Sequence, residues 1–190
     1  MAWILTIAAL ILWVPGACCQ SIGIYADSSG TDSSLQIPYP GPPVTIFVVA
    51  NPEGIQHDGI TTASFRIAGL PDGWSAQATP SPVVTVAIGD VFDDGVQMAW
   101  SYCIIEPVVL MRVSVTSATS FQDATIELET HRSEDGNCFF LTCGPCVKFC
   151  GCDGIPRCYC PETVPACING DGCALTIDAR TWTVMKALFK

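Results

Sequence analysis

Apolar and polar residues alternate along most of the chain between residues 20 and 135, a pattern typical of β-strands with one buried face. In Thr62–Leu70, for example, Phe65 and Ile67 share one face of the strand while Arg66 lies on the other. The predicted strands are Ile22–Tyr25, Pro43–Ala50, Thr62–Leu70, Val83–Ile88, Val96–Tyr102, Val108–Thr116 and Ala124–Thr130. Because turn residues and no helical period separate them, these strands predict an all-β fold, an antiparallel β-sandwich.

The two ends of the chain differ from this body. Ala2–Val14 is an uncharged apolar run, too short to span a bilayer but typical of the central part of a signal peptide. We therefore expect residues 1–19 to be a signal peptide and the protein to be extracellular or at the cell surface. Acylation of Cys18 or Cys19 as a lipoprotein is the alternative. At the other end, residues 174–190 predict a final strand and a short helix packed on the sandwich, and we expect no transmembrane helix in the mature chain.

Twelve cysteines are spread very unevenly, with nine of them between residues 138 and 173. Removing the leader leaves an even number, which predicts five disulfides in an oxidising compartment. The predicted disulfide cysteines are Cys103, Cys138, Cys143, Cys146, Cys150, Cys152, Cys158, Cys160, Cys167 and Cys173. The close pairs at 143–146, 150–152 and 158–160 keep zinc binding open as an alternative. The chain thus divides into a body (residues 20–135), a cysteine-rich segment (136–173) and the final strand and helix (174–190).

Charge narrows the choice of partners. The net charge is −10, and no cluster of Lys or Arg interrupts the acidic surface. Such a surface repels phosphate backbones, so we expect no nucleic-acid partner. A protein or a glycan at the cell surface remains as the expected partner.

Aspartates beside turn glycines suggest calcium as the only candidate cofactor. The candidate ligands are Asp27, Asp32, Asp90, Asp93 and Asp94. Their spacing does not match the twelve-residue EF-hand loop, and ordinary Asx-turns are the alternative explanation. A calcium-dependent shift in thermal unfolding would separate the two.

Catalytic chemistry has few candidates. The two histidines, His57 and His131, have no neighbouring nucleophile motif of the kind that hydrolases use. Glu127 and Glu129 share one strand face, but paired glutamates on an exposed sheet usually serve solubility. We therefore expect that the protein is not an enzyme. Trp74 follows a Pro-Asp-Gly turn and is a possible exposed platform for a ligand.

Two resemblances add to this picture. Val164–Asn169, Cys173 and Thr181–Phe189 resemble the C-terminal signature of a family of uncharacterised secreted proteins of environmental bacteria, and Ile22–Asp27 and Phe65–Trp74 are similar to the same family. That resemblance implies a secreted β-sandwich and brings no known activity. The middle region more loosely resembles cohesin-type sandwiches, which implies an immunoglobulin/cohesin-like fold and, by analogy, an interaction role. A secreted, disulfide-stabilised, non-catalytic binding module is therefore expected, with a purely structural envelope component or an extracellular hydrolase as alternatives.

Overall fold

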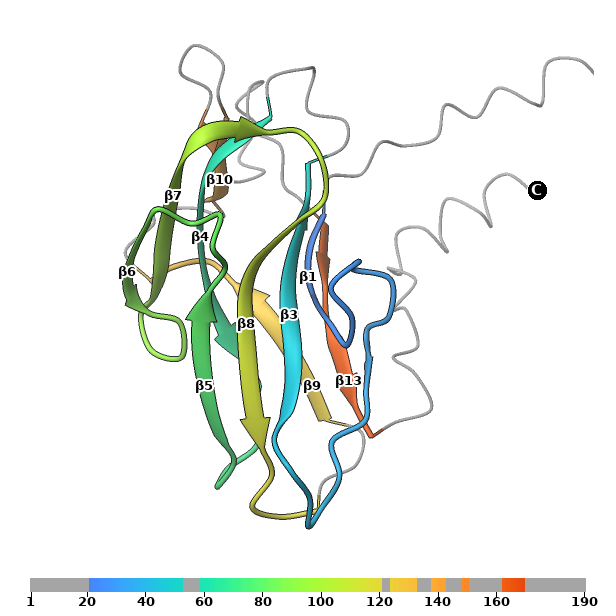
Figure 1. Ribbon diagram of the computed structural model, residues 1–190. Helices are drawn as coiled ribbons and strands as arrows, with labels where there is room; N and C mark the ends of the chain where they lie inside the picture. Colours follow the sequence, from blue (N-terminus) through green and yellow to red (C-terminus); the bar gives the residue numbers. More distant parts are fainter. Residues whose placement is uncertain are drawn as a thin grey trace, which may run out of the picture.

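The computed structural model describes residues 21–52, 59–120, 124–132, 138–142, 148–150 and 162–169. Within these ranges the chain is all-β and forms two sheets packed face to face, without a helix (Figure 1). The strands are β1 (Ser21–Tyr25), β2 (Ser34–Leu35), β3 (Val44–Asn51), β4 (Ile60–Ala68), β5 (Ser75–Pro80), β6 (Val86–Asp90), β7 (Gly95–Ile104), β8 (Val108–Thr116), β9 (Ala124–Glu129), β10 (Cys138–Thr142), β11 (Lys148–Cys150), β12 (Glu162–Val164) and β13 (Ala166–Ile168).

The first sheet has five strands in the order β12-β1-β3-β8-β5. Its centre is the β3–β8 pair, which is antiparallel over the full length of β3 except for one register shift between Val48 and Val49. Ile46 and Val48 of β3 and Val113 of β8 are buried while Thr45 and Arg112 are exposed, as expected for strands with one face on the core and one face outward. β5 closes one side of this sheet and pairs only with β8 among the described strands.

The second sheet has eight strands, and β4 is its hub. The first half of β4 pairs with β10 on one side and β7 on the other, and its second half pairs with β9. β7 in turn pairs with β6, which ends the sheet on that side. β9 continues through β13 to the short β2.

The hydrophobic core lies between the two sheets and is made by the inward positions of the alternating strands. Phe65 of β4 is fully buried at its centre. Two tryptophans of the core donate hydrogen bonds to backbone carbonyls. Trp100 Nε1 donates to the Ile60 carbonyl at 2.8 Å, and Trp74 Nε1 donates to the Thr119 carbonyl at 3.2 Å. Both indoles therefore have their one polar atom satisfied, which is the usual condition for burying this side chain.

The β-sandwich predicted from the alternation is confirmed, with differences in detail. The strand expected over Val83–Ile88 begins only at Val86, because a turn occupies the preceding residues, with Val84 N–H donating to the Ser81 carbonyl at 2.9 Å. The sheets are not purely antiparallel, since β12 runs parallel to β1 and β13 parallel to β2. Both β12 and β13 belong to the cysteine-rich segment and lie far along the sequence from their parallel partners, so no tight turn joins them.

The cysteine-rich segment contributes strands to both sheets. β10 and β13 pair with β4 and β9 of the body, and β12 pairs with β1. The predicted division of the chain into parts stays a prediction. The predicted signal peptide and the final strand and helix lie outside the described residues. Across the described part of the chain, we find no helix long and apolar enough to cross a bilayer.

Candidate binding site

The candidate site is formed where β7 separates from β4 near the β7–β8 turn. Ile60 pairs with Ile104, and Thr62 pairs with Ala99. The chain therefore advances by two residues on β4 and by five residues on β7 between these two pairs. The three extra residues form an arch that rises from the sheet. Irregularities of this kind often re-aim side chains next to functional sites.

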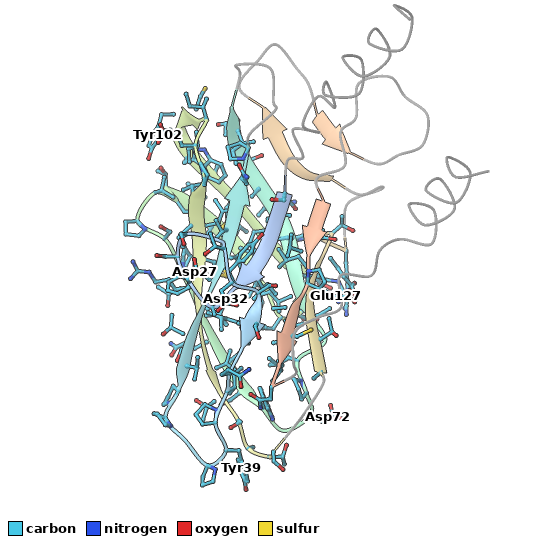
Figure 2. All side chains as sticks on the ribbon, turned by 90° about the vertical axis from the view of Figure 1, so that its right-hand side faces the viewer. Asp27, Asp32, Tyr39, Asp72, Tyr102 and Glu127 are labelled. Atoms are coloured by element: carbon cyan, nitrogen blue, oxygen red, sulfur yellow. The ribbon has the colours of Figure 1, made fainter. Side chains whose placement is uncertain are left out.

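The arch exposes three successive residues, Ser101, Tyr102 and Cys103, where a regular strand would expose every second one. Tyr102 is 58 % exposed, and Ile105 in the following turn is 60 % exposed. Tyr102 lies at one end of the sandwich and Tyr39 at the opposite end (Figure 2). Exposed large apolar side chains that gather in one place often mark an interaction surface.

A hollow of about 290 Å³ lies beside these two residues. It is lined by Tyr102, Cys103, Ile104, Ile105, Glu106, Pro107 and Val108. Glu106 is the single charged residue of that lining, so the hollow combines aliphatic side chains with a similar amount of polar surface, which includes one carboxylate and one phenol. This composition suits an apolar side chain of a partner, flanked by a polar or cationic group.

Two contacts fix the arch to the core. The bond from Trp100 Nε1 to the Ile60 carbonyl holds the base of the arch, and Trp100 is 4 % exposed. Gly59 passes directly beneath the turn with φ +67°, where a Cβ would lie only 2.5 Å from the Ile104 carbonyl oxygen. A glycine is therefore needed at this position for β4 to approach the turn so closely. These two features tie the arch to β4 and to the residue that precedes it.

The predicted calcium ligands do not meet at one place among the described residues. Both carboxylate oxygens of Asp27 accept hydrogen bonds from its own loop, at 2.8 Å from Ser29 N–H and 2.6 Å from Asp32 N–H. The hydroxyl of Ser29, with the backbone N–H groups of Asp32, Thr31 and Ser29, holds the pKa of the Asp27 carboxyl well below its ordinary value. Figure 2 shows Asp27 and Asp32 in this one loop.

The second acidic loop has a similar arrangement. Asp90 Oδ1 accepts the N–H of Phe92 at 2.9 Å, while Asp93 and Asp94 lie 3.5 and 3.2 Å from Nη1 of Arg132. No group of three or more His, Cys, Asp or Glu side chains in the described ranges is placed to share a metal ion. These contacts are those of Asx-turns and surface ion pairs, and calcium binding stays an untested prediction.

Most of the predicted disulfide cysteines lie outside the described side chains. Cys103 and Cys167 are the exceptions, and neither of them is without a partner. Cys103 belongs to the arch, and Cys167 lies on β13. In the backbone register of β10 and β11, Cys138 lies opposite Cys150. The pairing of the ten cysteines stays a prediction.

The candidate catalytic residues are also dispersed. Glu129 forms an ion pair with Arg66, its direct cross-strand neighbour, on the outer face of the second sheet. His131 lies at the end of β9 and packs against Gly95, and His57 lies outside the described residues. Trp74 is 8 % exposed and belongs to the core, so its indole does not form the surface platform considered from the sequence.

Sequence reasoning did not single out Tyr102, Ile105 or Glu106. The strand pattern placed Tyr102 on the same face as the buried residues Met98 and Trp100. The arch between Ala99 and Ile104 breaks that alternation. A partial signal exists in the sequence itself. Residues 102–105 are Tyr-Cys-Ile-Ile, so no polar residue alternates with the apolar ones there, as it would in a strand with one exposed face.

Comparison with known proteins gives little further information. No family model matches the chain, and no curated protein matches it. Among solved structures, the chain is similar to the seventh ScaB type I cohesin from Pseudobacteroides cellulosolvens, with a TM-score of 0.45 and 9 % sequence identity over 83 % of this chain and 96 % of that one. At this level of similarity, we infer neither fold nor function from the cohesin. The C-terminal resemblance to secreted bacterial proteins stays a prediction.

Proposed function

We propose that this chain is a secreted or cell-surface, non-catalytic interaction module stabilised by disulfides, and that the arch of β7 binds a protein partner. The observation that supports it most directly is the exposure of Tyr102 and Ile105 around the hollow at the β7–β8 turn. Aromatic and aliphatic side chains that are anchored on a rigid element and border a hollow are typical energetic centres of protein interfaces.

A protein partner is favoured over a glycan by the chemistry of the hollow. Sugar recognition usually uses several polar side chains around an aromatic face, whereas Ile104, Ile105, Pro107 and Val108 of this lining are aliphatic and only Tyr102 and Glu106 carry side-chain oxygens. The partner that fits is an apolar segment with a nearby Lys or Arg to meet Glu106. A glycan ligand is therefore an outcome that counts against this proposal.

The experiment places a photo-crosslinking amino acid at Tyr102 in the full chain, expressed in the cells that produce it. Tyr39 is the matched control, because it is a tyrosine of similar exposure (52 % against 58 %) at the opposite end of the sandwich. We expect one protein to be crosslinked from position 102 and not from position 39. The purified partner should then bind Tyr102→Ala at least tenfold more weakly than the wild type and bind Tyr39→Ala with unchanged affinity.

Three results would count against the proposal. A specific adduct with a polysaccharide at position 102 would make this a glycan site. Equal crosslinking from both tyrosines, or no adduct at position 102, would show that the arch contacts no protein partner. Equal affinity of the two alanine variants would place the interface elsewhere.

A further inference from the structure

A second surface lies along the side of the sandwich where both sheets end. β5 is the last strand of the first sheet and β6 the last strand of the second, and Figure 1 shows both on the same side of the molecule. Each of them pairs with one neighbour only among the described strands. A terminal strand leaves a row of backbone N–H and C=O groups free to pair with another strand.

The β6 strand has little of the usual protection of such an edge, apart from Asp90 at its last position. Every one of its five residues is exposed, with Val86 at 48 % and Ile88 at 66 %. Its register with β7 is regular, without a bulge that would twist it away from an approaching strand. Residues 83–89 contain no proline and no charged side chain. Natural edge strands usually carry a Lys, a Pro or a bulge for this purpose.

The distribution of charge along the chain bears on which partner can pair with the β6 edge. The chain carries a net charge of −10, so two copies repel each other over most orientations. However, residues 73–89 and 95–105 have no charged side chain, and these ranges include β5, most of β6 and all of β7. The uncharged edge is therefore a surface along which a second, equally acidic copy meets less repulsion than it would along a charged one.

We propose that β6 pairs with β6 of a second copy of this chain, antiparallel about a twofold axis at Ala87. That register places Val86 of each copy beside Ile88 of the other and joins the two second sheets into one continuous sheet. It is self-complementary, as a twofold interface requires. The side chains that meet are the two exposed aliphatic residues of the strand.

The same register keeps the acidic residues apart. Asp90 is the one charged residue of β6 and lies three positions from the axis. The two Asp90 residues are therefore six strand positions apart, about 20 Å at about 3.3 Å per residue. That separation is more than twice the screening length of about 8 Å at physiological ionic strength, so their repulsion is small.

Sedimentation equilibrium of the purified full chain, from micromolar to submillimolar concentration, tests this inference. We expect a monomer–dimer equilibrium that Ile88→Lys weakens at least tenfold, because the substitution places two lysines in the paired segment. Gln77→Lys is the matched control: it adds the same charge to an exposed position on β5 and should leave the dimer unchanged. Thermal unfolding verifies that both variants remain folded, and Val86→Lys provides a second variant at the interface.

A photo-crosslinker at Ile88 in a mixture of isotopically light and heavy chains locates the contact directly. A mixed adduct joining β6 to β6 supports the proposal. A monomer at all concentrations, or a dimer equally weakened by Gln77→Lys, overturns it. A mixed adduct that joins Ile88 to a segment other than β6 also overturns it, because the copies then contact each other elsewhere. None of these outcomes depends on the partner proposed for Tyr102.

Discussion

Asn169 joins the end of β13 to the segment that follows β2, and its replacement tests how the last strand is held in the second sheet. Its side-chain Oδ1 accepts the N–H of Ile37 at 2.7 Å, and its Nδ2 donates to the carbonyl of the same residue at 3.0 Å. Its backbone N–H donates to the Leu35 carbonyl at 2.8 Å. The amide side chain thus continues the β13–β2 ladder for one more residue, while its backbone turns away with φ +50°.

The expected losses follow from these contacts. Removing two partly buried hydrogen bonds costs about 0.5–1.5 kcal/mol each, so Asn169→Gly should lower the free energy of unfolding by about 1–3 kcal/mol. Extra flexibility of glycine in the unfolded chain adds about 0.4–1 kcal/mol. Asn169→Ala loses the same two bonds and keeps a Cβ in the left-handed region without the short polar side chain that makes this conformation accessible to Asn, which costs about 1–2 kcal/mol, as much as or more than the entropic cost of glycine. We therefore expect alanine to be the less stable variant, by up to about 1.6 kcal/mol.

Urea unfolding without reductant, followed by the fluorescence of the buried tryptophans, measures both differences. Equal slopes of free energy against urea would show that the variants unfold from the same compact state. A glycine variant within about 0.5 kcal/mol of the wild type would refute the role of the side-chain amide, since that is less than one net hydrogen bond. An alanine variant clearly more stable than the glycine variant would show that residue 169 does not adopt the left-handed backbone conformation.

Two further predictions concern the arch and the Asp27 loop. Trp100→Phe leaves the Ile60 carbonyl buried without its donor, so we expect a loss of about 1–3 kcal/mol in thermal unfolding, together with weaker partner binding at Tyr102. Asp27 has a folded-state pKa below its unfolded value of about 4, so its carboxylate stabilises the fold above that pH, and this contribution is lost as the pH falls. Urea unfolding between pH 2 and 7 should therefore show a smaller loss of stability on acidification for Asp27→Asn than for the wild type.

Most of the sandwich could be predicted from the sequence because its central strands have a clear apolar alternation. β3, β4 and β8 bury the apolar residues of their sequences, and the positions of these residues along each strand predict that burial. β5 was missed because its sequence, SAQATP, offers only alanines to the core. It becomes a strand through its partner, since six consecutive residues pair with β8. Pairing of this kind depends on tertiary context and has little local signal.

The candidate site was missed for a related reason. Alternation assigns a side chain to one face of a strand only while the register is regular, and the register between β4 and β7 shifts by three residues at the arch. For Trp74 the error was the reverse, since the sequence suggested an exposed side chain and the structure buries it. The turn before it forms as expected, with Trp74 N–H donating to the Pro71 carbonyl at 3.1 Å, but the indole turns inward over the core. A turn signal fixes the direction of the backbone and leaves the burial of the next side chain undecided.

The two proposed surfaces have a joint consequence for affinity. In the β6-paired dimer the axis passes near Met98, the cross-strand neighbour of Ala87, and Tyr102 lies four residues further along β7. Since the copies are antiparallel, the two Tyr102 sites lie on opposite sides of the axis, each four residues along β7 from Met98. Such a dimer cannot place both sites on one small partner, but it can bridge two copies of a partner fixed on a surface. The gain from pairing should therefore appear only with an immobilised or repetitive partner, where the second contact benefits from a high effective concentration. Ile88→Lys should remove that gain and leave the affinity for a monomeric partner in solution unchanged.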